Sequence, residues 1–384
     1  MQASIVTNGT DPRGLLERLT ALTRDLALIP STDARPEERR RCFEFCRNHL
    51  EALDGVDIRE FEHNGYTSLV ATPDHAPHPD VLLCGHLDVV EHPGRPRYVT
   101  RVDGGRIYGP GVGDMKGALA IMLELFRNLH RREPGLSLGL AITSDEERGG
   151  ESGVRFLFEE TGLRCSVAII PDGGTLNRII VEEKGILHLR LRARGHAAHA
   201  ARPWLGNNAL EHLADALSRL RGEFQALRAA PADAGEDHWY PTCAITGIST
   251  PNTSINRIPP DAEAVADIRF TPPHTAATLL ERIRAIAGDG VLLEPIISAE
   301  PTHLSPDPEF VNVTEAVTGR EAQLVRSSGG SDARFICRHG IPVLLSRPLV
   351  GELHSEDEWI DIESMGTYYR ICEQYIISRP GAVR

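Results

Sequence analysis

The 384-residue sequence contains no apolar run that approaches the roughly 20 residues a helix needs to cross a bilayer. Its first residues, MQASIVTNGTDPRG, lack the basic and then apolar signature of a secretory signal peptide. Internal repeats and low-complexity segments are also missing from the sequence. From these absences we expect a globular protein of the cytoplasm.

Positive charge is also in short supply. The 41 lysines and arginines are outnumbered by 54 aspartates and glutamates, which gives a formal net charge of -13. A nucleic-acid backbone requires a basic protein surface, so this balance argues against a nucleic-acid partner.

The seven cysteines lack the paired spacing of a disulfide framework or of a cysteine-based zinc site. Cys42 and Cys46 are four residues apart in a predicted helix, but no second pair follows them. We therefore expect reduced thiols that mostly pack in the interior.

Short apolar segments alternate with amphipathic ones over the first 182 residues. Leu15, Leu19 and Leu22 recur at helical spacing, whereas residues 81–84 are wholly apolar and end at a glycine, as a buried strand does. The same reasoning predicts helices at 13–28, 36–53, 116–129 and 151–160, and buried strands at 81–84, 138–143 and 167–170. This alternation is typical of an α/β domain with a mostly parallel sheet flanked by helices.

The pattern changes after Glu183, where leucines alternate with polar residues over 187–191, as in a half-buried strand. The segments that follow predict helices at 207–221 and 275–287, and strands at 242–248, 262–270 and 291–297. The resulting order, βαββαβ, is that of the ferredoxin-like unit.

The α/β character resumes near residue 300, with a strand expected at 341–345 and a helix at 362–376. A coherent unit flanked by the two halves of another domain indicates a domain insertion. We therefore predict an α/β domain formed by residues 1–182 and 301–384, with a ferredoxin-like domain inserted at 183–300.

The first candidate site residues are His86 and Asp88, in the segment CGHLD at the end of an apolar strand. Residues two apart in an extended chain point to the same side, which suits a metal-bound imidazole supported by a carboxylate. A capping histidine and a turn aspartate would explain the pair equally well.

Asp114 lies in the glycine-rich segment GPGVGDMKG, directly before the helix predicted at 116–129. An aspartate at this position commonly caps a helix, and in isolation we favour that interpretation over metal binding. The segment is not a phosphate-binding loop, because it lacks the P-loop spacing and the Lys-Ser/Thr ending.

Asp145, Glu146 and Glu147 follow the strand predicted at 138–143. Three adjacent carboxylates repel one another unless a cation lies among them. Since neighbouring residues in an extended chain face opposite ways, one glutamate could bind a metal while the other contacts a water on it. The alternative is a solvated acidic loop, which the preceding apolar strand makes less favourable.

Asp172 follows another buried strand, and His354 lies in the segment GELHSEDEW. Together with His86, Asp114 and Glu147, they lie at or just beyond the ends of elements in one α/β domain, where open α/β sheets bind ligands. Two histidines and three carboxylates are suitable ligands for a pair of zinc ions, with one carboxylate bridging.

The ordered segments HLDVV, GDMKG, TSDEE and PDG, together with the histidine at 354, resemble a family of di-zinc amidohydrolases. This family includes succinyl-diaminopimelate desuccinylase, acetylornithine deacetylase, glutamate carboxypeptidase and several dipeptidases. The resemblance extends from the helix at 13–28 to Glu358. It implies two Zn²⁺ ions, for which Co²⁺ or Mn²⁺ could substitute.

The resemblance also implies a role for each metal ligand. Asp114 would bridge the two ions, His86 and Asp172 would complete one site, and Glu147 and His354 would complete the other.

Beside the ligands, the resemblance implies that Glu146 is the general base and that Asp88 holds His86 in place. In the inserted domain, His199 of GHAAHAARP matches a family histidine that would stabilise the oxyanion, and Asn256 of SINRIP matches a substrate contact. We interpret the nearby His196 and Arg257 as surface residues.

Arg334, in the segment SGGSDAR, matches the position expected to bind the substrate carboxylate. Arginine suits this task because its planar fork meets both oxygens. The resemblance further implies that the inserted domain is a lid through which two chains form a homodimer.

Two positions depart from the family pattern. Asp172 stands where deacylases and carboxypeptidases of the family commonly carry glutamate, and Pro110 stands where many members have arginine. We expect hydrolysis of the amide bond of a small N-acyl amino acid, with succinyl or acetyl as the acyl group and no membrane partner. A dipeptidase or carboxypeptidase of the same family and an inactive metal-binding scaffold remain as alternatives.

Overall fold

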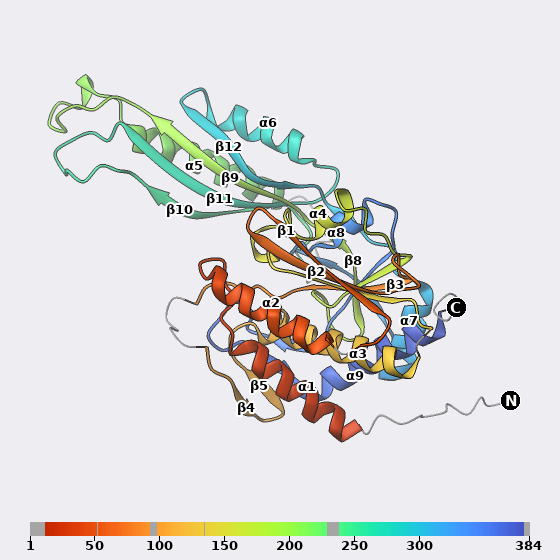
Figure 1. Ribbon diagram of the computed structural model, residues 1–384. Coiled ribbons are helices and arrows are strands. Elements are labelled where there is room, and N and C mark those ends of the chain that lie inside the picture. The colour runs from red at the N-terminus through yellow and green to blue at the C-terminus, as the bar shows by residue number, and fades with distance from the viewer. Residues whose placement is uncertain (1–11, 52, 93–97, 134, 229–237, 380–384) are drawn as a thin grey trace. The chain divides into compact units, whose positions relative to one another are not determined.

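The computed structural model describes residues 12–51, 53–92, 98–133, 135–228 and 238–379. They form two compact units (Figure 1). The first comprises the chain up to Val181, Leu304–Val325 and the chain from Ser331, and the second comprises Glu182–His303 and Arg326–Gly330. None of the helices described is both long and apolar enough to span a membrane.

The largest sheet in the described part of the chain has the strand order β1-β2-β6-β3-β7-β15-β8-β13, with β14 paired to β8. These strands are β1 (Val56–His63), β2 (Tyr66–Pro73), β3 (Val81–His86), β6 (Leu138–Thr143), β7 (Val167–Ile170), β8 (Arg178–Glu183), β13 (Thr302–His303), β14 (Gln323–Ser327) and β15 (Val343–Leu345). Strands β6, β3, β7 and β15 run parallel to one another. Strands β2 and β8 border this parallel group in the antiparallel direction.

Successive side chains of the parallel strands enter two cores on opposite faces of this sheet. Leu83 packs in one core, with side chains from α1 (Pro12–Ala27), α2 (Pro36–Leu50), α3 (Gly117–Arg132), α7 (Pro308–Thr318) and α9 (Ile362–Ser378). Leu82 and Cys84 pack in the other, with side chains from α4 (Val154–Glu159) and α8 (Ala333–Cys337). Because both faces are covered by helices (Figure 1), the strands are apolar throughout. The predicted α/β fold, with a mostly parallel sheet flanked by helices, is confirmed.

A small sheet of the first unit has the order β16-β17-β5-β4. Its strands are β4 (Arg101–Asp103), β5 (Arg106–Tyr108), β16 (Val350–Gly351) and β17 (Trp359–Asp361). Trp359 pairs with Tyr108, so the chain that leads into the glycine-rich segment lies beside the chain that follows His354. We did not predict these strands, because two or three residues are too few to show a period.

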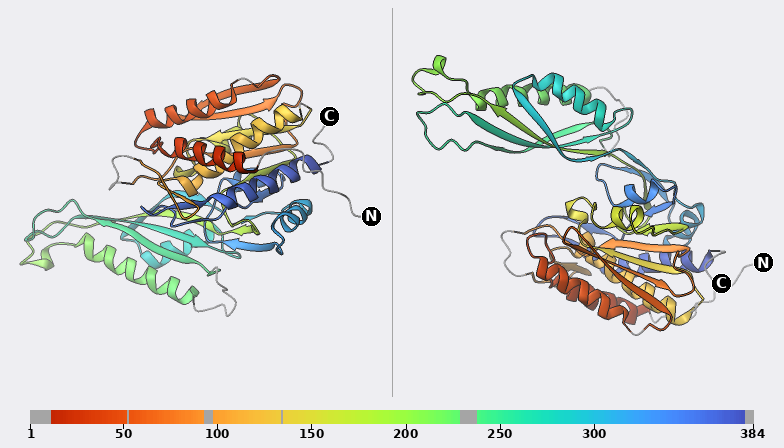
Figure 2. Two further views of the ribbon diagram at one scale, coloured as in Figure 1. Left: turned by 90° about the horizontal axis from the view of Figure 1, so that it is seen from below. Right: turned by 45° about the horizontal axis from the view of Figure 1, so that its top comes forward.

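The second unit contains an antiparallel sheet in the order β10-β11-β9-β12, with α5 (Ala209–Arg228) and α6 (Ala276–Ala287) packed against it (Figure 2). The strands are β9 (Gly185–Arg194), β10 (Thr242–Ser249), β11 (Asp261–Phe270) and β12 (Val291–Ala299). Leu189 of β9 is buried in the core that the helices complete. Its neighbour Arg190 is partly exposed and pairs with Glu263 at 3.2 Å. The predicted βαββαβ order is confirmed.

Some boundaries differ from the predicted ones. The helix predicted at 151–160 begins only at Val154, because the backbone N–H groups of Ser152 and Gly153 donate to the carboxylate of Asp145. The hairpin formed by β1 and β2 was not predicted, although its turn carries Asn64 and Gly65 with positive φ angles of 50° and 79°. Such an Asn-Gly pair is the sequence signal of a type I′ hairpin turn.

Candidate metal centre

Three neighbouring parallel strands, β6, β3 and β7, end at the same edge of the large sheet, and each brings a candidate side chain there. His86 is the last residue of β3. Glu147 lies shortly after β6, and Asp172 lies shortly after β7. The strand order therefore accounts for the meeting of three residues that are far apart in the sequence.

Asp114 is held at this edge by a turn before α3. Gly111 has a φ of 73°, a left-handed conformation that favours glycine. The carboxylate of Glu358, which is 1% exposed, accepts hydrogen bonds from the backbone N–H groups of Gly111, Gly113 and Asp114 at 3.1, 2.8 and 3.0 Å. Asp114 does not cap α3, which begins at Gly117 without a side-chain cap. The helix-cap interpretation of Asp114 is therefore wrong.

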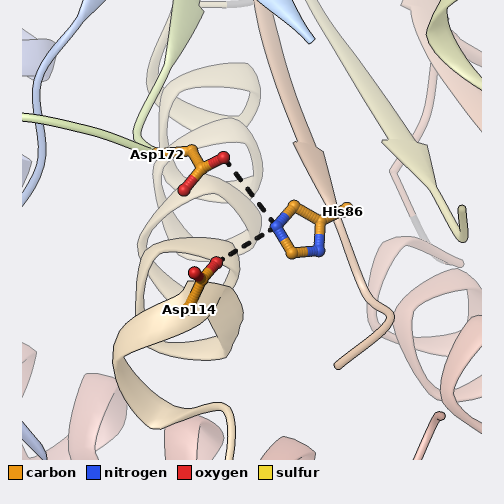
Figure 3. Close-up of side chains that lie close together, drawn as sticks. All are labelled: His86, Asp114 and Asp172. Carbon is orange, nitrogen blue, oxygen red and sulfur yellow. Dashed lines mark ion pairs between the residues drawn. The ribbon is translucent and has the colours of Figure 1, made fainter. Parts of the chain in front are cut away.

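The five candidate ligands form two clusters that share Asp114. In the first, Nε2 of His86 lies 3.3 Å from Oδ1 of Asp114 and 4.0 Å from Oδ2 of Asp172 (Figure 3). In the second, Nε2 of His354 lies 3.3 Å from Oδ2 of Asp114 and 3.5 Å from Oε1 of Glu147. Asp114 thus presents one carboxylate oxygen to each histidine.

Nε2 of His86 and Oε1 of Glu147 are buried, and despite their ion-pair contacts of 3.3 and 3.5 Å neither makes a hydrogen bond of normal geometry with a described residue. Buried polar atoms are normally paired, so each of these atoms indicates a partner that the protein itself does not supply. Imidazole nitrogens and carboxylate oxygens are ligands that zinc and related divalent metals accept. Both clusters therefore fit metal ions.

The protonation of the clusters agrees with this interpretation. Burial raises the pKa of Asp172 to about 8, and the negative charge of Asp114 adds to this effect. Burial by itself would lower the pKa of His86, but its contacts with Asp114 and Asp88 raise it well above the usual range. The contact with Asp114 is the main cause that raises the pKa of His354 to about 10. Protons on these side chains thus partly compensate the negative charge of the carboxylates. A bound metal ion would replace these protons.

Asp88 supports the first cluster from the side away from Asp114. Nδ1 of His86 donates to the backbone carbonyl of Asp88 at 3.0 Å and lies 3.5 Å from its carboxylate. Because Nδ1 is the donor in this contact, Nε2 is the nitrogen that faces the cluster, and it can bind a metal once a metal has replaced its proton. The carboxylate oxygens of Asp88 also accept hydrogen bonds from the backbone N–H groups of Glu146 and Glu147 at 3.3 and 3.0 Å.

Glu146 lies beside the clusters and belongs to neither of them. Burial raises the pKa of its carboxyl group well above the usual range. The positive charge of His86 opposes this shift, whereas the negative charge of Asp172 increases it. Glu146 is therefore close enough to His86 and Asp172 for their charges to shift its pKa, although it is not a candidate ligand.

Arg334 belongs to the first unit and is 6% exposed. Its Nη2 donates to the backbone carbonyl of Gly149 at 2.6 Å, and its Nη1 donates to that of Ser331 at 3.4 Å. Its guanidinium group also lies over the ring of Phe335, 4.5 Å from the ring centre. In this structure Arg334 therefore holds the backbone of the loop that follows Glu147.

His199 and Asn256 belong to the second unit, whereas the metal clusters belong to the first. Within the second unit, their segments lie side by side, because the N–H of Ala200 donates to the carbonyl of Asn256 at 2.8 Å. Both residues are exposed. His196 and Arg257 are also exposed, as predicted.

Two charged residues near the clusters were not predicted as site residues. One is Glu358, which holds the turn that carries Asp114. The other is Arg347, whose Nη1 lies 3.5 Å from Oδ1 of Asp172. A signal for Arg347 exists in the sequence, because it follows the apolar segment 341–345 closely, as Asp172 follows its own strand.

Comparison with known proteins identifies relatives of the chain. Residues 82–378 match the peptidase family M20/M25/M40. The succinyl-diaminopimelate desuccinylase of Alkalilimnicola ehrlichii is 31% identical over 320 residues, which cover 77% of this chain and 82% of the relative. The enzyme of the same name from Burkholderia ambifaria is 29% identical over 385 residues, with 93% of this chain and 98% of the relative covered.

Solved structures with the same fold include a carboxypeptidase and a dipeptidase. A metallo-carboxypeptidase of the M20 family from Sulfolobus solfataricus matches with a TM-score of 0.75 at 19% identity, covering 96% of this chain and 99% of that one. A dipeptidase from Saccharomyces cerevisiae matches with a TM-score of 0.77 at 15% identity, covering 96% and 98%. At these identities the similarity shows a shared fold.

Substituting the two adjacent glutamates separates a metal ligand from a residue that only lies next to the metal. We predict that Glu147→Gln lowers the amount of metal bound per chain, because Oε1 of Glu147 faces His354 in the second cluster. Glu146→Gln should bind as much metal as the wild type. The metal bound per chain is measured by elemental analysis after dialysis against limiting zinc. Equal metal contents in the two variants would contradict this assignment.

Proposed function

The chain belongs to peptidase family M20/M25/M40, and we propose that it hydrolyses the amide bond of an N-acyl amino acid at a centre of two zinc ions. Membership of this family confirms the resemblance predicted from the sequence and makes the chain a metal-dependent amidohydrolase. The observation that carries the proposal is the division of the two oxygens of Asp114 between His86 and His354.

We assign Asp114 to both zinc ions, His86 and Asp172 to one, and Glu147 and His354 to the other. The same ligands could hold Co²⁺ or Mn²⁺, because the order of metal affinities does not decide which metal a protein carries in the cell. When bound, the ions supply Lewis-acid polarisation of the amide carbonyl and lower the pKa of a water molecule.

The remaining chemistry falls to side chains of this protein. Glu146 accepts a proton from the water that attacks the amide carbon, and it delivers a proton to the leaving nitrogen as the C–N bond breaks. Its place next to Glu147 and outside both sets of candidate ligands supports this role. Asp88 keeps His86 in the orientation and tautomer that the centre requires.

The similarity to desuccinylases at about 30% identity favours an N-acyl amino acid as the substrate, with succinyl ahead of acetyl as the acyl group. A dipeptidase or carboxypeptidase of the family remains the alternative, and Asp172 favours the dipeptidase, because it replaces the glutamate that deacylases and carboxypeptidases of the family commonly carry. The third candidate, an inactive metal-binding scaffold, is the least favoured. Such a scaffold has no need to retain Glu146 beside a complete set of ligands.

We further propose that the second unit is a lid and that it joins two chains into a homodimer. In this arrangement His199 donates a hydrogen bond to the carbonyl oxygen as negative charge develops there, and Asn256 binds the substrate. Their exposure supports a role towards a ligand or a partner chain. We keep Arg334 as a candidate for binding the substrate carboxylate, because its two backbone hydrogen bonds use two of the five donor hydrogens of the guanidinium group.

We place the enzyme in the cytoplasm. No disulfide joins any of the seven cysteines, all of which lie in the described part of the chain, and this agrees with a reducing compartment. The small amino acid derivatives that we propose as substrates would be met there as metabolites.

A substrate panel tests the proposed function. We predict that the zinc-loaded enzyme hydrolyses N-succinyl and N-acetyl amino acids with a higher kcat/KM than dipeptides with a free amino group. Removal of the metal by a chelator should abolish this activity, and returning zinc should restore it. A preference for dipeptides would favour the alternative function, and hydrolysis of none of the panel would favour the scaffold.

Mixing two inactive variants tests whether His199 acts on the centre of a partner chain. Alone, His199→Ala should lower kcat by about 100- to 1,000-fold with the metal content unchanged, because a donor to the developing oxyanion is lost. We predict that activity returns when His199→Ala and Glu146→Ala chains exchange subunits. In each mixed dimer one centre then combines an intact Glu146 with the partner's intact histidine. If no activity returns although mixed dimers form, His199 serves its own chain.

A further inference from the structure

Arg347 emerges from the large sheet next to Asp172. Strand β15 runs parallel to β7, with Leu345 paired to Ile170 at their ends. The two strands continue past the sheet edge in the same direction, which places Arg347 beside Asp172. Within the described residues, the carboxylates of the two metal clusters form ion pairs with histidines and with one arginine. That arginine is Arg347, which contacts Asp172.

The contact with Asp172 does not use all the donors of Arg347. Nη1 lies 3.5 Å from Oδ1 of Asp172, longer than the roughly 2.7–2.9 Å of a strong charged hydrogen bond. Nε is buried and has no hydrogen-bond partner within the described chain. An arginine carries five donor hydrogens in a fixed fork and always remains charged, so Arg347 offers a preformed partner for a planar anion.

Arg334 differs from Arg347 in this respect. Two of its nitrogens already donate to the backbone carbonyls of Gly149 and Ser331. No backbone carbonyl is recorded as a partner of Arg347 in the described part of the chain, and its side chain is 15% exposed. Arg334 thus uses two of its five donor hydrogens on the backbone, whereas Arg347 has one ion-pair contact, with Asp172, and a buried Nε without a partner in the described chain.

We propose that Arg347 binds a carboxylate of the substrate and thereby selects anionic substrates for the metal centre. The inference rests on the proposed amide hydrolysis, and it assigns the anion-binding residue for that reaction. One oxygen of Asp172 faces Arg347 and the other faces His86, so a single carboxyl group separates the guanidinium from the metal cluster. A carboxylate a few bonds from the scissile amide can therefore reach Arg347 while the amide lies at the centre.

An N-acyl amino acid can offer Arg347 either of two carboxylates. One belongs to a dicarboxylic acyl group such as succinyl, and the other is the carboxylate of the amino acid itself. The test compares an N-succinyl amino acid, its N-acetyl counterpart and its N-succinyl amino acid amide in the wild type and in Arg347→Gln. Arg347→Lys keeps the positive charge but removes the planar guanidinium group, which can donate to both oxygens of a carboxylate. Arg320→Gln, at an exposed position, controls for the change in net charge.

We expect Arg347→Gln to lower kcat/KM by about 10- to 100-fold for every substrate that carries the bound carboxylate, the range for losing a hydrogen bond to a charged group. Arg347→Lys should lower kcat/KM by a smaller factor, and Arg320→Gln should leave kcat/KM unchanged. If the loss disappears with the N-acetyl substrate, Arg347 binds the acyl carboxylate. If it disappears with the amide, Arg347 binds the carboxylate of the amino acid.

An equal loss on all three substrates would overturn the proposal, because Arg347 would then only hold Asp172 in place. A measurement without turnover accompanies the kinetics, in which succinate is titrated into the zinc-loaded proteins by calorimetry. We expect Arg347→Gln to weaken succinate binding by at least tenfold with the metal content unchanged, and equal affinities would contradict the proposal. Should the wild type hydrolyse none of the substrates, the proposed function fails, and the succinate titration alone decides the role of Arg347.

Discussion

The carboxylate of Asp114 must present one oxygen to His86 and the other to His354, and much of the first unit is arranged to keep it there. His86 approaches from a buried strand, and His354 approaches from the segment between β16 and β17, where its φ of 61° is left-handed. Glu147 and Asp172 lie against the same carboxylate. Their mutual repulsion would disfavour this arrangement unless cations compensate it. The stability of the site is therefore linked to metal binding, since an ion that binds the folded state stabilises it.

The supports of Asp114 come from distant parts of the chain. Glu358 joins the turn before α3 to the segment that carries His354, through three hydrogen bonds from the backbone to one buried carboxylate. Asp88 similarly joins His86 to the backbone of Glu147. Each support fixes two candidate ligands at once, so a substitution in either should disturb both metal clusters and not only the nearer ligand.

The elements that we predicted correctly are those whose pattern lies within their own residues. The strands that carry His86 and Asp172 are uninterrupted apolar runs, because helices cover both faces of the sheet. The hairpin around Asn64 was also predictable, since its turn has a recognised signal. The small sheet was not predictable, because its strands are too short to show a pattern and pair segments far apart in the chain. The role of Glu358 depends on such a distant pairing, so no neighbouring residue reveals it, whereas Arg347 closely follows an apolar segment and could have been found.

The sharing of Asp114 by two metal ions is tested most directly by a crystal structure of the zinc-loaded protein with anomalous diffraction data collected at the zinc edge. We predict two zinc peaks, one on each side of Asp114, with His86 and Asp172 at one and Glu147 and His354 at the other. A single peak, or two peaks that do not share Asp114, would contradict this prediction.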